Sequence, residues 1–302
     1  MYKNYKIRAP FFEIGPKCFM WGERMLRLAL EIDRIAEEFD LDVIVTPQYT
    51  DIRMIAENTK HIHVYAQHMD SLAPGRGLGS VLPEAVKEAG AVGVMLNHAE
   101  KKLTLEEIEK TIARADEVGL ATIVCADSVA EIEAVAKLSP NLIVAEPTEL
   151  IGTGGASDMG YVKDTIEAVR RIDPGIMVLQ GAGISTPDDV ANVIRAGALA
   201  TGCTSGVMKA KDPEAAARAM LSTLRRVWDE VHAELAGPIK YLTRHMPHLR
   251  QRRSRCVRPP ECLTAPNSKR RFRCLPRLSA LRHPAAVTPA SPAATLRIST
   301  AV

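Results

Sequence analysis

The sequence predicts an α/β protein, specifically a closed (β/α)8 barrel. Short apolar runs alternate with amphipathic helical patterns over about the first 235 of the 302 residues. The apolar runs are continuous rather than alternating, which is typical of parallel strands covered on both faces. Eight such β–α units match the strand number and size of a barrel. A doubly wound open sheet is the alternative, but it usually has fewer strands, and no Gly-rich dinucleotide-binding turn follows the first strand.

Each predicted strand is a run of apolar, often β-branched residues that ends in a polar or glycine-containing segment. The eight runs, in chain order, are PFFEIG (10–15), DVIVTP (42–47), HVYAQH (63–68), VGVMLNH (92–98), ATIVCAD (121–127), LIVAEP (142–147), IMVLQGAGI (176–184) and LATGCTS (199–205).

The helices between these runs have recognisable starts. In LTLEEIEKTIARADEVG (103–119), Thr104 is a candidate N-cap, Glu107 can complete a capping box, and Gly119 ends the helix. Proline at the first helical position predicts two further starts, at Pro187 and Pro213. The apolar stripe expected to face the core in the first of these helices consists of Leu105, Ile108, Ile112 and Ala115.

The net charge of +3 conceals two unlike segments. From Pro238 onward the chain holds 14 of its 39 Lys/Arg, one of its 36 Asp/Glu and 9 of its 19 prolines, so this part carries +13. Residues 1–237 hold the other 25 basic and 35 acidic side chains and carry −10. We therefore predict a barrel domain at 1–237 and a disordered basic tail at 238–302, because such a composition cannot bury a core.

The tail has three possible interpretations. A dozen or so positive charges suit a nucleic-acid arm, but from Arg244 onward Phe272 is the only aromatic residue that could stack on a base. A zinc site is disfavoured because Cys256 and Cys262 lack a second Cys/His pair. An accidental extension, such as a frameshifted gene end, often yields Arg, Pro, Ala and Ser, and we favour it over nucleic-acid binding.

Composition also bounds the cellular setting. Apolar residues make up 46% of the chain, which is ample for a large core. No run of eighteen apolar residues predicts a membrane span, and the first ten residues, MYKNYKIRAP, lack the apolar core of a signal peptide. We expect a cytoplasmic protein with reduced thiols, because its six cysteines show no disulfide pattern; they are Cys18, Cys125, Cys203, Cys256, Cys262 and Cys274.

Polar residues end several of the predicted strands. In a barrel the carboxyl ends of all strands meet at one mouth, where the site is built. Lys17 follows the first strand, His98 the fourth and Glu146 the sixth. Lys17 alone could be a solvated charge and His98 alone a structural histidine, but Glu146 in an apolar strand is costly to bury without a purpose. His61 and His63 lie at the other end and are given no role.

Three loops at the same mouth contain glycine, serine or threonine, whose backbone N–H groups can approach an anion. Loops after strands seven and eight are the usual phosphate site of such barrels. A carboxylate, an imidazole and a lysine beside a phosphate favour proton abstraction next to a carbonyl, with a lid at TELIGTGG that excludes water. The loop residues concerned are Gly152, Gly154, Gly181, Gly183, Ser205 and Gly206.

Five motifs together resemble the triosephosphate isomerase family, most closely its short archaeal-type branch. They are LNHAE (96–100), VCAD (124–127), AEPTELIGTGG (145–155), GAGIST (181–186) and TSGVMKAKDPE (204–214). The resemblance covers about residues 8 to 230 in order, without a large insertion. It implies a TIM barrel and an aldose–ketose isomerase of glycolysis and gluconeogenesis that needs no metal or cofactor. The implied reaction interconverts glyceraldehyde 3-phosphate and dihydroxyacetone phosphate through an enediolate.

The resemblance also implies residue roles. Glu146 would be the general base, His98 a neutral electrophile and Lys17 the cation beside the substrate oxygens. The implied substrate- and phosphate-binding residues are Gly15, Ile151, Gly152, Gly183, Ser185, Thr204 and Ser205.

The first loop departs from the family pattern. The family has Asn, any residue, then Lys, whereas this chain has Gly15, Pro16 and Lys17; Ala99 also replaces the family's serine. These changes touch the sugar end, so a four-carbon ketose phosphate is an alternative substrate. A phosphate-metabolite-binding barrel without catalysis is a further alternative. The family assembles as homodimers or homotetramers, and residues 69–86 could reach a neighbouring subunit.

Overall fold

The computed structural model describes residues 1–150, 159–181 and 183–245. For residues 234–245 it describes only the backbone. The chain divides into two units, Met1–Pro247 and His248–Val302. The second unit lies wholly outside the described residues, as does the greater part of the predicted tail.

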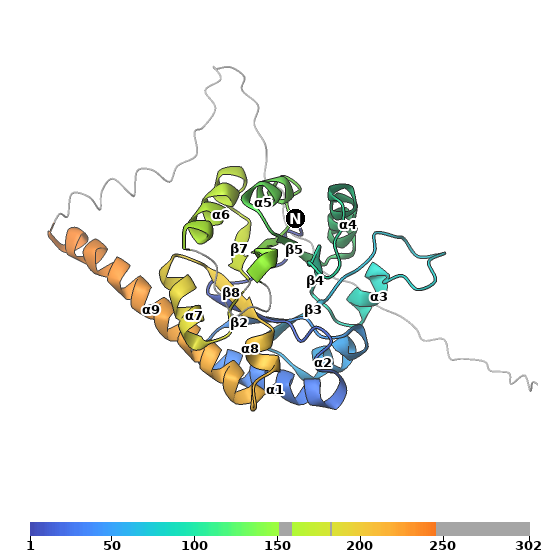
Figure 1. Cartoon of the computed structure of the whole chain (residues 1–302), viewed down its shortest axis with the longest axis horizontal. Coiled ribbons are helices and arrows are strands. Elements are labelled where there is room, and N and C mark those ends of the chain that lie inside the picture. Colours follow the sequence, from blue (N-terminus) through green and yellow to red (C-terminus); the bar gives the residue numbers. More distant parts are fainter. Residues whose placement is uncertain (151–158, 182, 246–302) are drawn as a thin grey trace, which may run out of the picture. The chain divides into compact units, whose positions relative to one another are not determined.

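Eight parallel strands close into a barrel in which each strand pairs with the next along the chain and β8 pairs with β1 (Figure 1). This confirms the predicted α/β (β/α)8 fold and excludes the open doubly wound sheet. The strands are β1 (Phe11–Ile14), β2 (Asp42–Val45), β3 (Ile62–Ala66), β4 (Gly93–Leu96), β5 (Ala121–Ala126), β6 (Leu142–Ala145), β7 (Met177–Gln180) and β8 (Ala200–Cys203).

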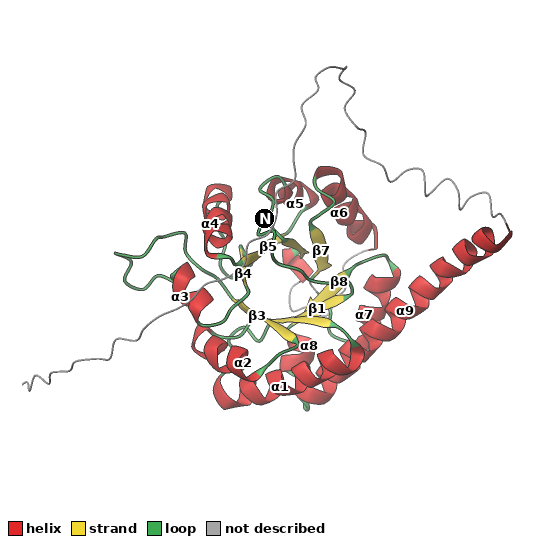
Figure 2. Cartoon of the chain, turned by 180° about the vertical axis from the view of Figure 1, so that it is seen from behind, coloured by secondary structure: helices red, strands yellow, loops and turns green. Residues whose placement is uncertain are grey.

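The helices form a ring outside the strands, as the views from both sides show (Figures 1 and 2). No helix among the described residues combines the length and the apolarity that a membrane crossing needs. The helices are α1 (Gly22–Phe39), η1 (Tyr49–Asp51), α2 (Ile52–Asn58), α3 (Pro83–Glu88), α4 (Leu105–Val118), α5 (Val129–Ala136), η2 (Thr148–Leu150), α6 (Met159–Ile172), α7 (Pro187–Arg195), α8 (Ser205–Met208) and α9 (Pro213–His245).

The predicted start of α4 is confirmed. Thr104 Oγ1 accepts from the Glu107 N–H at 3.2 Å, and the Glu107 carboxylate accepts from the Thr104 N–H at 2.7 Å, so a capping box is present. Gly119 ends the helix at φ 79°, a left-handed conformation that suits glycine. The predicted stripe is wrong at Leu105, which is 49% exposed. Leu105 is the first residue of α4, ahead of the buried positions Ile108, Ile112 and Ala115.

Side chains alternate along the strands between two cores. Residues of one parity point into the barrel and pack on one another, whereas their neighbours pack between strands and helices. On β1, Phe11 belongs to the inner cluster and Phe12 and Ile14 to the outer one. The inner cluster consists of Phe11, Ile44, Tyr65, Ala121, Ile123, Cys125, Leu142, Val144, Leu179 and Ala200. This parity decides which strand residues can reach the mouth.

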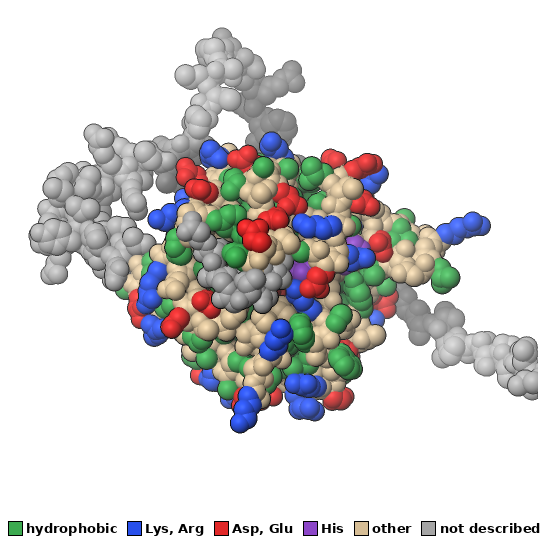
Figure 3. Space-filling view, in the orientation of Figure 1, with side chains coloured by type: hydrophobic (Ala, Val, Ile, Leu, Met, Phe, Trp, Pro, Cys, Tyr) green, Lys and Arg blue, Asp and Glu red, His purple; other side chains and the backbone are tan. Residues whose placement is uncertain are grey.

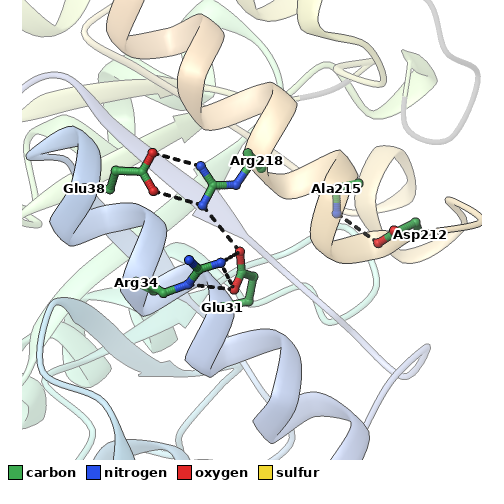
Figure 4. Close-up of polar contacts among 6 residues, drawn as sticks. All are labelled: Glu31, Arg34, Glu38, Asp212, Ala215 and Arg218. Atoms are coloured by element: carbon green, nitrogen blue, oxygen red, sulfur yellow. Dashed lines mark hydrogen bonds and ion pairs between the residues drawn. The ribbon is translucent and has the colours of Figure 1, made fainter.

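Helices α1 and α9 pack together across the point where the chain closes the ring. Arg218 on α9 donates to both carboxylate oxygens of Glu38 on α1, at 3.0 and 2.9 Å, and also lies within 3.5 Å of Glu31 (Figure 4). Its guanidinium lies 5.8 Å from the centre of the Phe39 ring. The helix α9 continues to His245, so the last helix ends later than the composition shift at residue 238 suggests.

Candidate active site

A cavity of about 430 Å³ lies at the carboxyl ends of the strands. Acidic, basic and histidine side chains gather near the middle of the face seen in Figure 3. The structure brings seven of the sequence-predicted site residues together as lining of this cavity: Gly15, Lys17, His98, Glu146, Gly183, Thr204 and Ser205. Two other predicted residues, Ile151 and Gly152, lie outside the described residues.

His98 and Glu146 face each other across the mouth. Nε2 of His98 lies 3.7 Å from Oε2 of Glu146, and the two side chains are only 14% and 16% exposed. Glu146 directly follows β6, and its N–H donates to the carbonyl of Ala126 on β5 at 2.9 Å. The backbone of two neighbouring strands therefore holds the carboxylate over the cavity.

The His98 ring is held as a neutral hydrogen-bond donor. The backbone N–H of Glu100 donates to Nδ1 at 3.1 Å, so the proton of the neutral ring resides on Nε2, which faces Glu146. Burial, together with the nearby cations Lys17 and Lys102, lowers the pKa of His98 to about 4 despite the opposing effect of Glu100. A neutral imidazole polarises an oxygen without transferring its proton early.

Asn97 fixes the turn that carries His98. It has a positive φ of 59°, which is uncommon for a residue other than glycine. Its amide donates to the carbonyl of Cys125 at 2.9 Å and to Glu131 at 3.1 Å, and its Oδ1 accepts from the Leu103 N–H at 2.9 Å. These three bonds tie the turn after β4 to β5, to α5 and to the segment just before α4.

Lys17 is held by both its side chain and its backbone. Nζ donates to Oε1 of Glu100 at 2.8 Å, which links the loop after β1 to the loop after β4. The backbone has a positive φ of 47°, and its carbonyl accepts from the side-chain amides of Gln48 at 2.6 Å and Gln67 at 3.0 Å. Strained backbone supported in this way is common at functional sites. Sequence reasoning did not identify the two glutamines as supports.

Sequence reasoning also missed Glu13. It shares the inward parity of Phe11 on β1, is 8% exposed and lines the cavity. Burial and, to a lesser degree, the charge of Glu146 raise its pKa to about 8, although the Thr46 hydroxyl and Lys17 oppose the shift. The available signal was an acid inside the otherwise apolar run PFFEIG, which is the argument that singled out Glu146.

Two glycines make room for these two acids. Glu13 is paired in register with Gly202 on β8, where an added Cβ would lie 2.8 Å from the Glu13 carbonyl and 3.0 Å from its Cβ. At Gly181, directly after β7, an added Cβ would lie 2.9 Å from Val144 Cγ1 and 3.1 Å from Glu146 Cβ. Each carboxyl group therefore lies beside a neighbouring strand that has no side chain at that level.

The loops after β7 and β8, where the sequence predicts anion binding, contribute Gly183, Thr204 and Ser205 to the lining of the cavity. Gly183 adopts φ 75°, and Thr204 precedes the short helix α8, whose first N–H groups have no partner within the helix. Ser185 does not line the cavity; its N–H donates instead to Asp189 at 3.0 Å, next to the capping box of α7. Lys209 lines the cavity and was not singled out from the sequence.

The predicted lid begins in the described part of the chain. Residues Thr148–Leu150 form η2, and the N–H of Thr148 donates to Oδ1 of Asp127 at 3.2 Å. The rest of TELIGTGG, from Ile151, lies outside the described residues. At the opposite end of the barrel, His63 lies 3.8 Å from Asp42, and neither His61 nor His63 lines the mouth cavity. Both histidines therefore lie at the end of the barrel where the sequence predicts them.

A closed (β/α)8 barrel with an acid, a neutral imidazole and a lysine around one small cavity defines the class of TIM-barrel isomerases. The family model of triosephosphate isomerase matches residues 17–220. The chain belongs to the triosephosphate isomerase family. It is 41% identical over 206 residues to the triosephosphate isomerase of Methanobacterium bryantii, a match that covers 67% of this chain and 91% of the relative.

Further archaeal relatives agree. The triosephosphate isomerase of Methanocaldococcus jannaschii is 42% identical over 203 residues, covering 66% of this chain and 92% of the relative. That of Sulfurisphaera tokodaii is 36% identical over 212 residues, covering 69% and 92%. These matches confirm the predicted family and its short archaeal-type branch.

Proposed function

We propose that this chain interconverts glyceraldehyde 3-phosphate and dihydroxyacetone phosphate through an enediolate intermediate. The observation that carries the proposal is the approach of His98 Nε2 to within 3.7 Å of Glu146 Oε2 in a cavity that Lys17 also lines. A base and a hydrogen-bond donor must act on adjacent atoms of the substrate, and two groups this close together can contact one small substrate at the same time.

Glu146 is the proposed general base. Its carboxylate removes the proton from the carbon beside the carbonyl and returns it to the former carbonyl carbon. The hydroxyl proton passes to the former carbonyl oxygen by way of His98 Nε2, so the reaction has no net proton change. The Nε2–H of His98 donates to the oxygens on which negative charge develops, and the Lys17 ammonium stabilises the same charge. Glu100 and the two glutamines hold Lys17 in place for this role.

The phosphate group is proposed to bind at the backbone of Gly183, Thr204 and Ser205. The N–H groups of Ser205 and Gly206 have no acceptor within the short helix α8, which leaves them available to an anion. Ile151 and Gly152 are proposed to close over the phosphate as part of the lid, as the family resemblance implies. A closed lid would keep water from the enediolate.

The decisive experiment compares Glu146→Gln with Glu167→Gln in a coupled assay on glyceraldehyde 3-phosphate. Glu167 is an exposed glutamate on α6 outside the cavity, so it is a matched control for the loss of one carboxylate. We expect Glu146→Gln to lower kcat by about 10²- to 10⁴-fold, the usual contribution of a general base, and the control to match wild type. Turnover that survives in Glu146→Gln would contradict the proposed mechanism.

We also infer that the chain forms homodimers or homotetramers through its first and third loops. The loop between β3 and α3 projects from the barrel (Figure 1), and it carries the fully exposed Leu78. Phe19 and Trp21 after β1 are 47% and 65% exposed. Large apolar side chains at this exposure favour an interface. Sedimentation of wild type against Leu78→Asp tests this: the variant should shift toward the monomer, and an unchanged mass would contradict it.

A further inference from the structure

Glu13 is a buried acid in the mouth that has no part in the proposed mechanism. It lies on the inward face of β1, one residue pair deeper than Gly15, and it lines the same cavity as His98 and Glu146. A carboxyl group is costly to bury, and an apolar residue of the same parity, such as Phe11 below it, would fill the barrel without that cost. The presence of a carboxyl group at this position of the cavity therefore indicates a functional role in the site.

The contacts of Glu13 engage only one of its two carboxyl oxygens. Thr46 Oγ1 donates to Oε1 at 2.9 Å, and this is the carboxyl group's only side-chain hydrogen bond in the described part of the chain. No hydrogen bond to Oε2 is present among the described residues, so this oxygen is available to a ligand in the cavity that Glu13 lines. Since Oε1 accepts the hydrogen bond from the Thr46 hydroxyl, the carboxyl proton of a neutral Glu13 resides on Oε2.

The charges around Glu13 favour this neutral form. Glu146 faces it with a negative charge, and the thiols of Cys125 and Cys203 have pKa values that burial and Glu13 itself hold high, so they are neutral. Lys17 is the one cation among the groups that affect its pKa, and its Nζ is already paired with Glu100. With a pKa of about 8, Glu13 is mostly protonated at pH 7 and has one O–H to donate.

Glu13 also occupies the space of a side chain at position 15. A Cβ built on Gly15 would lie 2.9 Å from Glu13 Oε1 and 3.2 Å from Thr46 Oγ1. The carboxyl group thus lies where a polar group from position 15 would otherwise reach the cavity.

We propose that Glu13 is a substrate-binding and specificity-determining residue, whose Oε2–H hydrogen-bonds to an oxygen at the sugar end of the phosphorylated substrate. This rests on the proposed function of the mouth. The phosphate grip lies on the loops after β7 and β8, so Glu13 contacts the sugar end and not the phosphate.

The test separates the sugar from the phosphate. Glu13→Leu removes the hydrogen bond, whereas Glu13→Gln keeps a neutral donor of the same shape. We expect Glu13→Leu to lower kcat/KM for glyceraldehyde 3-phosphate about 10-fold or more and Glu13→Gln to lower it no more than about 3-fold, the size of one hydrogen bond. The Kd of inorganic phosphate should stay within about twofold in both. A kcat/KM that Glu13→Leu leaves unchanged, or a parallel loss of inorganic phosphate affinity, would overturn the proposal.

A rescue variant guards against a merely misfolded Glu13→Leu protein. Gly15→Asn alone should be impaired, because its Cβ meets Oε1 of Glu13, whereas Glu13→Ala/Gly15→Asn should recover most of kcat/KM by delivering a polar group from position 15. If kcat/KM of the double variant does not exceed that of Glu13→Ala, a side chain at position 15 does not replace the carboxyl group of Glu13, which contradicts the proposal.

Binding measurements separate failure of this proposal from failure of the proposed function. Glyceraldehyde 3-phosphate binding to Glu146→Gln and to Glu146→Gln/Glu13→Leu reports on Glu13 without turnover. Weaker binding only in the double variant supports the role of Glu13, and equal binding overturns it. Survival of turnover in Glu146→Gln bears on the mechanism alone.

Discussion

The Nε2 atom of His98 lies 3.7 Å from Oε2 of Glu146, although the two residues belong to strands β4 and β6 with β5 between them. The N–H of Glu100 on Nδ1 fixes which face of the ring is turned to the acid. One loop thus supplies both the hydrogen bond that orients the imidazole and the carboxylate that binds Lys17. The electrophile and the cation are therefore positioned by the same short turn.

The neutral state of His98 predicts a flat pH profile on the acid side. Because burial and the nearby lysines hold its pKa near 4, the ring stays neutral from pH 8 down to about 5. We therefore expect the pH profile of kcat to show no decrease between pH 8 and pH 5 that arises from protonation of His98. His98→Gln should accordingly leave the shape of the profile unchanged over this range. Imidazole chemical shifts followed by NMR should likewise show no titration of His98 near its ordinary pKa of 6.5. A midpoint above 6 would contradict the neutral donor.

Lys17 and Glu100 make a pair of predictions of different size. Lys17→Met removes the ammonium that stabilises developing charge and should lower kcat/KM by about 10²-fold or more. Glu100→Gln keeps the ammonium and loses only one of its holders, so we expect a loss below about 10-fold. Steady-state kinetics on both variants test this order. Equal losses would mean that the ion pair, and not the cation, is what the site requires.

The fold and the acid–imidazole pair were predictable because each signal is local. Continuous apolar runs indicate parallel strands, and Glu146 and His98 stand where such runs end. The supports of Lys17 were not predictable, since Gln48 and Gln67 reach it across 31 and 50 residues of sequence. Glu13 was predictable in principle but lies inside a strand, where only barrel parity shows that it faces the mouth. Ser185 has the right loop but directs its N–H to the capping acid of α7.

Replacing Gly181 should lower activity by displacing the base Glu146, without changing any side chain that contacts the substrate. Gly181→Ala places a methyl group 3.1 Å from Glu146 Cβ and 2.9 Å from Val144 Cγ1, so the base must shift by a few tenths of an ångström. A misplaced base should lower kcat by about 10-fold or more. Gly175→Ala is the control, since its nearest neighbour is the oxygen of the Asp173 side chain, which can move. Wild-type kcat in Gly181→Ala would show that this glycine is not required by the acid.

The raised pKa of Glu13 makes the barrel less stable as the pH rises. The folded state holds the proton up to about pH 8, whereas an ordinary glutamate releases it near 4.5. Between these values the folded state binds more protons than the unfolded state, so the free energy of unfolding falls with pH by up to about 1.4 kcal/mol per pH unit. Glu13→Gln has no proton to lose and should be free of this decline.

Urea unfolding at pH 5, 6.5 and 8 therefore tests the protonation of Glu13 without any substrate. The stability of Glu13→Gln relative to wild type should rise steadily from pH 5 to pH 8, because only wild type must keep a buried acid protonated against a falling proton concentration. Glu167→Gln, at an exposed glutamate, should run parallel to wild type over the same range. A difference between Glu13→Gln and wild type that stays constant at all three pH values would contradict the prediction. It would mean that Glu13 is ionised in the folded barrel and cannot donate a hydrogen bond to the substrate.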